Sequence, residues 1–272
     1  MTLSNAVTMQ LQHVTDIQSL EQYLRHYPVE NAFELGYLDP AYAEACQWFA
    51  RTDENGIRTL ALLYTGLSRP ALFFVGHPDG VAPLLRHYQD QLPERVFVRS
   101  PRGLFDAVKT SYEPAGEIRQ MERMGLNRST FLARDNGAAY DEVEVLTHKD
   151  TGAIMQTYAA WPDHFFDPYQ LSSGLYFGIR GDNNDVASIA GIHNLSERYD
   201  VAAIGNLVTH PDYRGRGYAH RCTVVLLRHL FERVGLVALD VQSGNVAAIR
   251  TYQRFGFQPH AEFFEGEMQL KG

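Results

Sequence analysis

The sequence predicts an α/β protein, because helical and extended patterns alternate along the chain and this series of patterns occurs twice. Apolar residues recur at helical spacing over residues 13–27, and short apolar runs suited to strands follow. A similar alternation restarts near residue 142, after the polar, Gly-containing stretch 134–137. We therefore expect two domains, formed by residues 1–136 and residues 137–272.

The first half of the chain begins with a possible strand at residues 9–11 and a helix at residues 13–27. Pro28 ends this helix, because proline lacks the backbone donor that a continuing helix needs. The other elements expected in this half are a helix at 30–38, strands at 46–51, 58–64 and 71–75, a helix at 81–91, a strand at 96–99, a helix at 104–111 and a strand at 117–124.

The second half begins with a strand at residues 142–146 and a helix at residues 151–160, which Trp161-Pro162 ends. An aromatic-rich segment, residues 163–170, comes next. The elements expected after it are strands at 174–180, 186–195 and 202–209, a long helix running to about residue 234, a strand at 236–241, a helix starting at 245 and a strand at 262–270.

Composition indicates a water-soluble enzyme or binding protein. The chain has 272 residues, of which 45% are hydrophobic and 21% charged, as in globular domains. Its net charge of -8 argues against a general nucleic-acid binder, which would be basic. No apolar run approaches the length of a membrane span, and we see no signal peptide. With only Cys46 and Cys222, a disulfide framework is not expected, so we predict a cytoplasmic protein without membrane association.

A strand, a Gly-rich turn and a helix start follow one another in residues 202–219. His210-Pro211-Asp212 breaks the strand, and the turn then reads Arg214-Gly215-Arg216-Gly217-Tyr218-Ala219. Glycines let the backbone approach a ligand closely, and free N–H groups at a helix start favour anions. The two arginines add positive charge suited to phosphate oxygens. The stretch therefore predicts a phosphate-binding loop, although taken alone it could be an ordinary basic turn.

Two familiar phosphate-binding motifs do not fit this loop. A Walker A motif needs Lys-Ser/Thr after its last glycine, and here Tyr218-Ala219 follows. A dinucleotide fingerprint needs a third glycine, and the residue three positions after Gly217 is His220.

A second motif follows downstream, where a strand at 236–241 leads into a helix. Asn245 and Tyr252 fall on one face of that helix, and Gly256 is placed to cap its end. Together, the patterns R-x-x-G-x-A and N-x-x-A-x-x-x-Y-x-x-x-G-F closely resemble the GNAT superfamily of acyl-CoA N-acyltransferases. The tandem layout resembles the glycine N-acyltransferase-like branch, and mycothiol synthase is another tandem relative.

The resemblance implies a mixed, mostly antiparallel twisted sheet flanked by helices in each domain, and acetyl-CoA as cosubstrate. Tyr252 matches the general acid that protonates the coenzyme A thiolate, and Gly205 could relax its strand into a bulge. The positions implied in cofactor binding, besides Tyr252, are Leu207, Val208, Thr209, Arg214, Gly215, Arg216, Gly217, Tyr218, Ala219 and Asn245.

The general base is where the sequence departs from the family. Many members carry a glutamate on the strand before the loop, but residues 202–206 contain no carboxylate. His193, Glu197 and His164 are candidates, and a water held by the backbone is an alternative. The aromatic segment 163–170 matches the acceptor-pocket loop, although ordinary packing explains it as well. Histidine and cysteine spacings predict no metal.

The first half lacks the phosphate-binding motif. Where a loop should follow its fourth strand stand Gly76-His77-Pro78-Asp79-Gly80, with no arginine and with a carboxylate that would repel phosphate. We expect a degenerate GNAT-like domain here, with an unrelated α/β domain as the alternative. The whole chain is then predicted to acylate a primary amine of a small molecule, as a monomer or homodimer. The alternative is an acyl-CoA-binding sensor without turnover.

Overall fold

The computed structural model describes residues 9–161, 165–182 and 184–272 and divides the chain into two compact units. Unit 1 comprises residues 1–122 and 261–272, and unit 2 comprises residues 123–260. This division by contacts differs from the expected boundary at residue 136, and it groups the C-terminal strand with the first unit. The interpretation of the units as two GNAT-like domains stays a prediction.

Unit 1 contains most elements expected for the first half, and its sheet is antiparallel except for one pair. Strands β1 to β5 and β13 follow one another in the sheet, and β6 pairs with β13. Among these pairs of described strands, β4 and β5 run parallel and the others run antiparallel. The elements are β1 (Gln10–His13), α1 (Ile17–Leu24), α2 (Ala32–Gly36), β2 (Cys46–Asp53), β3 (Gly56–Tyr64), β4 (Ala71–Gly76), α3 (Val81–His87), β5 (Arg95–Pro101), α4 (Arg102–Val108), β6 (Tyr112–Pro114), β7 (Arg119–Asn127), which continues into unit 2, and β13 (Gln258–Leu270), which begins there.

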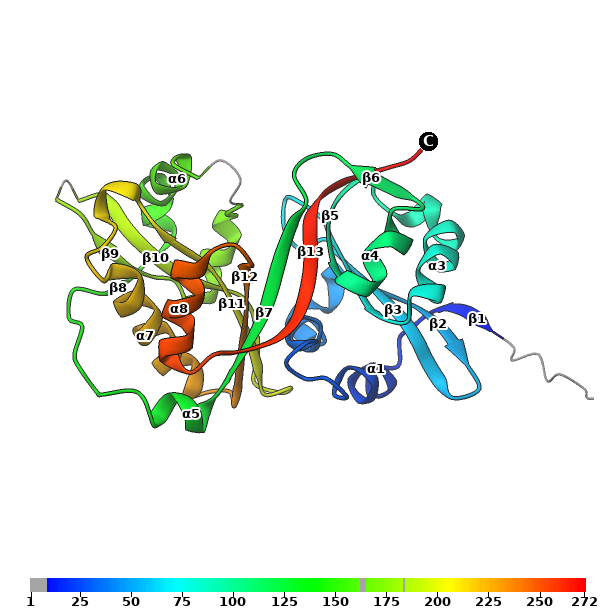
Figure 1. Cartoon of the computed structure of the whole chain (residues 1–272), viewed down its shortest axis with the longest axis horizontal. Helices are drawn as coiled ribbons and strands as arrows, with labels where there is room; N and C mark the ends of the chain where they lie inside the picture. The colour runs from blue at the N-terminus through cyan, green and yellow to red at the C-terminus, as the bar shows by residue number, and fades with distance from the viewer. Residues whose placement is uncertain (1–8, 162–164, 183) are drawn as a thin grey trace, which may run out of the picture. The chain divides into compact units, whose positions relative to one another are not determined.

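Helices α3 and α4 cover a core formed by the middle strands of unit 1 (Figure 1). Their apolar side chains, such as Leu84 and Phe105, are buried with Ala61, Leu72 and Val98 of the sheet. Burial of this kind supplies most of the favourable free energy of folding. The loop between β4 and α3 corresponds in order to the loop between β11 and α7 of unit 2.

Unit 2 repeats the arrangement of one parallel pair in an otherwise antiparallel sheet. Its strands follow the order β12-β11-β10-β9-β8, and among the four pairs that these described strands form, β11 and β12 run parallel and the others antiparallel. Its elements are α5 (Arg128–Leu132), β8 (Glu144–Val145), α6 (Thr151–Ala159), β9 (Phe177–Arg180), β10 (Val186–Ser196), β11 (Val201–Thr209), α7 (Tyr218–Phe231), β12 (Leu236–Gln242) and α8 (Val246–Phe255).

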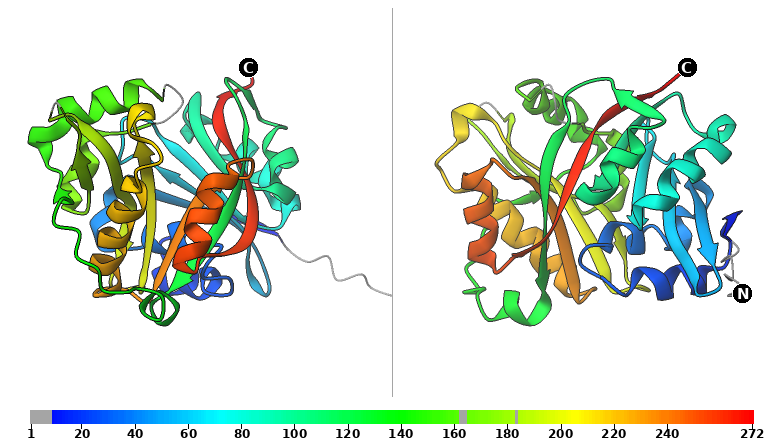
Figure 2. Two further views of the ribbon diagram at one scale, coloured as in Figure 1. Left: turned by 60° about the vertical axis from the view of Figure 1, so that its left-hand side comes forward. Right: turned by 45° about the vertical axis from the view of Figure 1, so that its right-hand side comes forward.

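The two faces of the unit 2 sheet carry different helices (Figure 2). Helices α7 and α8 bury Leu226 and Phe255 against one face, together with Ile204 and Leu239. Helix α6 buries Ile154 on the other side with Ile189 of β10. The predicted mixed sheet flanked by helices is therefore confirmed.

The sequence missed β6 and α5. The helix begins at Tyr218, because Gly215 and Gly217 adopt left-handed dihedrals that cannot continue a right-handed helix. No helix in the described part of the chain is both long and apolar enough to cross a membrane.

Candidate functional site

The loop between β11 and α7 presents a row of unused backbone donors. A short 3₁₀ turn, Pro211–Tyr213, follows the strand, and Gly215 and Gly217 then take φ angles of 76° and 75°. Gly217 is the N-cap of α7 and provides no side chain to cap it. Within the described residues, the N–H groups of residues 215–219 donate no hydrogen bond. Free N–H groups at the start of a helix form an anion site.

Two side chains that the sequence did not single out hold this loop in place. The Tyr213 ring is buried, and its hydroxyl accepts from the Asp182 amide at 3.2 Å and donates to Asp185 Oδ1 at 3.2 Å. Arg221, one turn into α7, donates to the Arg216 carbonyl at 2.7 Å and pairs with Glu142. These contacts order the loop before a ligand arrives, which reduces the entropic cost of binding.

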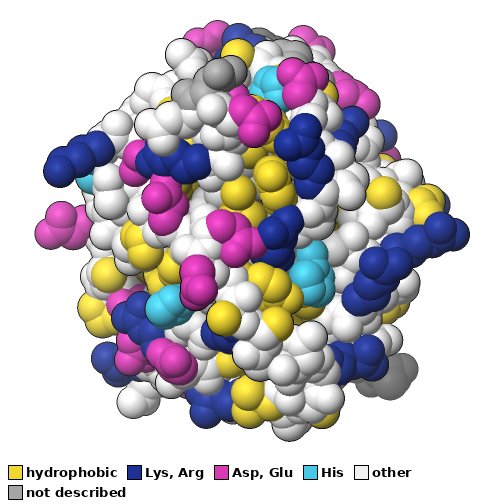
Figure 3. Space-filling model, turned by 90° about the vertical axis from the view of Figure 1, so that its left-hand side faces the viewer, with side chains coloured by type: hydrophobic (Ala, Val, Ile, Leu, Met, Phe, Trp, Pro, Cys, Tyr) yellow, Lys and Arg dark blue, Asp and Glu magenta, His cyan; other side chains and the backbone are white. Residues whose placement is uncertain are grey.

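Arg214 and Arg216 remain available to an anion. Both side chains are exposed, and neither forms an ion pair with a described residue. The Arg214 guanidinium lies 4.4 Å from the Trp161 ring centroid, and that of Arg216 lies 5.0 Å from the Tyr213 centroid. Cation–π contacts of this kind orient a guanidinium without neutralising its charge. On the face drawn in Figure 3, basic and acidic side chains are interspersed, and the basic side chains form no continuous positive surface.

Next to the loop, β11 separates from β12. The parallel pairing runs from Val201↔Leu236 to Ile204↔Leu239 and stops there. Residues 205–209 continue as a strand paired only with β10, which leaves their other edge unpaired with β12. Leu207, Val208 and Thr209 lie along this edge. An unpaired strand edge can form main-chain hydrogen bonds with an extended ligand.

The expected bulge is present, one residue beyond Gly205. The register between β10 and β11 shifts from Ile189↔Val208 to Gly191↔Gly205, which places one extra residue in β11. Asn206 takes the left-handed conformation, with φ 56°, and its amide donates to Tyr176 Oη at 2.6 Å and Gln170 Oε1 at 3.2 Å. Sequence reasoning missed this network, because its members come from separate elements. It holds the bulge open beside the unpaired edge.

His193 lies against this bulge. A second register shift, between Ile192↔Ile204 and Asn194↔Ala203, makes His193 the extra residue of β10. A Cβ at Gly205 would lie 2.0 Å from His193 Nε2, so only glycine admits the imidazole at this distance. Of the other candidate bases, Glu197 pairs with Arg233 beyond the C-terminal end of α7, about 20 Å from the loop along the 14-residue helix. His164 lies outside the described residues.

Helix α8 carries the remaining predicted residues. Asn245 is its N-cap, and Asn245 Oδ1 accepts from the Ala248 amide at 3.1 Å, which confirms the expected cap. Gly256 ends the helix with φ 105°, also as expected. Tyr252 packs half-buried against the core, where burial raises the pKa of its phenol. Its hydroxyl forms no hydrogen bond with any described residue.

Residues 147–257 match the model of the acetyltransferase (GNAT) family. This segment is therefore similar to the GNAT family, and it lies within unit 2. Among curated proteins, the mycothiol acetyltransferase of Mycobacterium ulcerans is 27% identical over 65% of this chain and 53% of its own length. The chain thus spans about half the length of that relative.

Solved structures resemble the chain in fold over nearly its whole length. A Drosophila protein covers 96% of this chain and 98% of its own, at 17% identity and a TM-score of 0.68. A tandem GNAT protein from the clavulanic acid biosynthesis pathway covers 97% of this chain and 99% of its own, at 14% identity and a TM-score of 0.57. At these identities, the likeness concerns the fold.

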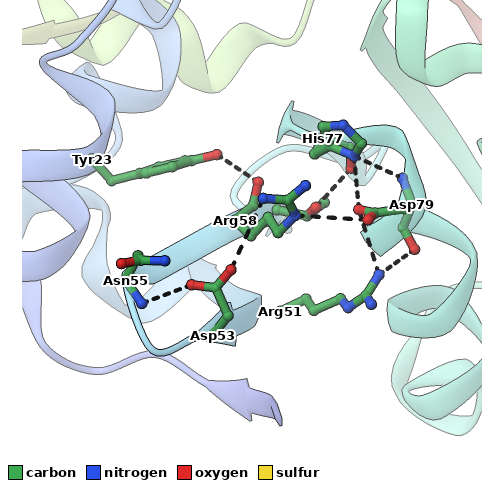
Figure 4. Close-up of polar contacts among 8 residues, drawn as sticks. Tyr23, Arg51, Asp53, Asn55, Arg58, His77 and Asp79 are labelled. Carbon is green, nitrogen blue, oxygen red and sulfur yellow. Dashed lines mark hydrogen bonds and ion pairs between the residues drawn. The ribbon is translucent and has the colours of Figure 1, made fainter. Parts of the chain in front are cut away.

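In unit 1, the loop between β4 and α3 holds a carboxylate of its own (Figure 4). Asp79 Oδ1 lies 2.8 Å from His77 Nδ1 and 3.5 Å from an Arg51 nitrogen. Its Oδ2 lies 3.7 Å from Arg58 Nε, and Arg58 also approaches Asp53 at 3.9 Å. The positive side chains near this loop are therefore matched to carboxylates within the unit, unlike Arg214 and Arg216.

Proposed function

We propose that the chain is an acetyl-CoA-dependent N-acyltransferase that acylates a primary amine of a small molecule by direct attack. The observation that carries the proposal is the position of the anion loop directly after the place where β11 leaves β12. A ligand with a pyrophosphate and an extended arm of amides would match both features. Coenzyme A has this chemistry.

Acetyl-CoA supplies the thioester whose acyl group is transferred. The N–H groups of residues 215–219 would bind its pyrophosphate, with Arg214 and Arg216 adding charge-assisted hydrogen bonds. The free edge of Leu207, Val208 and Thr209 would pair with the pantetheine amides. Asn245 uses Oδ1 for its cap, which leaves its amide group to donate to the same arm.

Tyr252 would protonate the departing thiolate. Burial raises the pKa of the phenol, so it stays protonated through the neutral range and can donate. The hydroxyl has no protein partner among the described residues that would compete for its proton. Donation by a positioned acid contributes about 10²- to 10⁴-fold to a rate.

His193 is the side chain best placed to receive the proton of the attacking amine. Its ring lies against Gly205, beside the bulge at Asn206 and near the free edge of β11. A neutral imidazole is a suitable base near neutral pH. Replacing Gly205 by alanine would push the His193 ring away from this position. We therefore expect Gly205→Ala to lower turnover, as His193→Ala should.

We infer the class of acceptor from the names of the relatives. They are called mycothiol acetyltransferases, a name that refers to a small molecule, and we propose a small-molecule acceptor for this chain as well. Membership of the glycine N-acyltransferase-like branch, a cytoplasmic location and a monomeric or dimeric state stay predictions.

Release of free thiol from acetyl-CoA, measured with a panel of small primary amines, tests the proposal. We expect amine-dependent release by the wild-type protein and about 10²-fold less by Tyr252→Phe. Acetyl-CoA binding without thiol release for any amine would instead identify an acyl-CoA sensor. Failure to bind acetyl-CoA would overturn both interpretations.

A further inference from the structure

Helices α5, α7 and α8 line a small cavity in unit 2, together with residues of the segment between α5 and β8. The cavity has a volume of about 100 Å³. Since a water molecule needs about 10 to 15 Å³, a cavity of this size admits a group as large as a phosphate. Its polar lining side chains are Arg134, Asp135, Asn136, Tyr140, His220 and Arg254.

The acceptor groups of this lining are already occupied. Asp135 accepts from Arg228 Nε at 2.7 Å and Nη2 at 2.6 Å, and from the Gly137 amide at 3.1 Å. Asn136 Oδ1 accepts from the Ala138 amide at 3.0 Å. The carboxylate of the cavity is therefore neutralised by an arginine of α7, and it does not pair with the other arginines of the lining.

The donor groups of the lining are unused. The guanidinium groups of Arg134 and Arg254 form no hydrogen bond or ion pair with any described residue. In the described part of the chain, the Tyr140 hydroxyl, the His220 ring nitrogens and Asn136 Nδ2 also have no hydrogen-bond partner. A lining with free donors, two free positive charges and occupied acceptors is the complement of an anion.

Ring contacts fix His220 in the wall of the cavity. Its ring stacks on Phe255, with centroids 4.8 Å apart and planes at 15°, and meets the Tyr140 ring edge-on at 6.4 Å. Burial, first of all, and the positive charges of Arg254 and Arg221 lower the pKa of His220. The ring is therefore neutral at pH 7, and one of its nitrogens can donate to an anion.

The cavity lies close to the anion loop. His220 follows Gly217, the N-cap of α7, by three residues, or about 4.5 Å along the helix axis. Arg134 lies over the C-terminal end of α8, because a Cβ at Gly256 would be 3.0 Å from Arg134 Nε. A ligand that carries a second phosphate near its pyrophosphate can therefore reach both the loop and the cavity.

We propose that this cavity binds a phosphate monoester, which in the acetyl-CoA complex is the 3′-phosphate of the cofactor. The inference rests on the proposed function, which places the pyrophosphate of the same cofactor at residues 215–219. The 3′-phosphate is carried by the ribose next to the pyrophosphate, and a phosphate monoester has about two negative charges at pH 7 and three acceptor oxygens. Arg134 and Arg254 would neutralise these charges, while Tyr140 and His220 would donate to the oxygens.

Calorimetric titration of the full chain with coenzyme A and with 3′-dephospho-coenzyme A tests the proposal, because the two ligands differ only in this phosphate. We expect the wild-type protein to bind coenzyme A about tenfold more tightly or better, as charge-assisted hydrogen bonds to the phosphate require. Equal affinity for the two ligands would overturn the proposal and leave the proposed acyl-transfer function intact. Binding of neither ligand would overturn both.

Two substitutions locate the 3′-phosphate, each checked for an unchanged circular dichroism spectrum and melting temperature. Arg134→Gln and Arg254→Gln each remove one cavity charge from an exposed side chain. Each should weaken coenzyme A binding by about tenfold and leave the affinity for the dephospho form unchanged. Arg198→Gln, which removes the same charge from an exposed side chain of unit 2 outside the cavity, is the matched control and should keep the full preference. A preference that survives both cavity substitutions, or that the control reduces equally, would refute the site.

Titration with inorganic phosphate separates the cofactor from a free anion as the source of the phosphate. We expect the wild-type protein and Arg254→Gln to bind inorganic phosphate equally weakly, because a phosphate without the attached pyrophosphate bears the full entropic cost of association. Inorganic phosphate that binds the wild-type protein but not Arg254→Gln, while coenzyme A and its dephospho form bind equally, would assign the cavity to a free anion and overturn the cofactor assignment.

Discussion

The turns after β4 in unit 1 and after β11 in unit 2 start alike and end differently. Each begins His-Pro-Asp and forms a short 3₁₀ turn, with the histidine Nδ1 3.5 Å or 3.3 Å from the amide nitrogen two residues later. In unit 1, four residues (77–80) separate the strand from the helix, and in unit 2 there are eight (210–217). The longer turn contains both arginines and both left-handed glycines.

The two turns differ in whether their arginines have carboxylate partners within the unit. In unit 2, Arg214 and Arg216 remain without carboxylate partners among the described residues. In unit 1, Asp79 lies among Arg51, Arg58 and His77. The carboxylate satisfies the local charge and would repel a second anion.

The largest expected effect is the difference in coenzyme A affinity between the two turns. Unit 1 lacks at least two charge-assisted hydrogen bonds, each worth about 1.5 to 3 kcal/mol, so its affinity should be negligible. Titration calorimetry should therefore give one coenzyme A per chain. Two equivalents per chain, or nucleotide density beside residues 76–80 in a crystal, would contradict the prediction that unit 1 does not bind coenzyme A.

The next effect concerns the helices that follow the second parallel strand of each unit. Helix α8 carries Tyr252, whereas α4, with the sequence RGLFDAV, has no tyrosine. Tyr252→Phe should lower kcat by about 10²-fold with little change in acetyl-CoA affinity. Because burial raises the pKa of Tyr252, the wild-type rate should show no loss from phenol ionisation up to pH 10. Steady-state kinetics across pH would check this, and equal turnover by both proteins would mean that the ring only packs.

A smaller effect is expected from reversing one charge of the longer turn. Arg216→Glu places a carboxylate at the pyrophosphate position, as Asp79 does in unit 1, and should weaken acetyl-CoA binding by at least tenfold. Arg86→Glu, which changes an exposed arginine of unit 1 by the same charge, is the control and should bind normally. Equal affinities of the wild-type protein and Arg216→Glu for acetyl-CoA in calorimetry would show that the loop is not part of the cofactor site.

The smallest effect concerns stability in the shorter turn. Burial alone would raise the pKa of Asp79, but the His77 hydrogen bond and the charges of Arg51 and Arg58 outweigh it and lower the pKa. A lowered carboxyl pKa stabilises the fold above the unfolded value, near pH 4, and this contribution disappears as the pH falls through the folded value. Asp79→Asn should therefore lower the unfolding free energy at pH 7 by less than about 1 kcal/mol, since the side chain is 43% exposed.

Denaturant titrations of the wild-type protein and Asp79→Asn at pH 7 and pH 3 would measure this difference. The unfolding free energies of the two proteins should become similar at pH 3. A larger difference in unfolding free energy at pH 3 than at pH 7 would show that Asp79 is not an internal counter-ion.

Much of the fold was predictable because its elements have local signals. The strand and helix around the anion loop follow from apolar periodicity, and the caps at Asn245 and Gly256 follow from residue type. The short β6 and α5 were missed because three and five residues show no clear period.

The sequence by itself determined the loop, its arginines and glycines, and Tyr252 on helix α8, because each depends on residues close together in the chain. Only the tertiary structure decided that β11 leaves β12 after Ile204 and that Asn206 is held by Tyr176 and Gln170. It likewise decided that His193 lies against Gly205 and that Asp79 is surrounded by Arg51 and Arg58. These contacts join residues far apart in sequence, and their geometry depends on strand register, which no local pattern specifies.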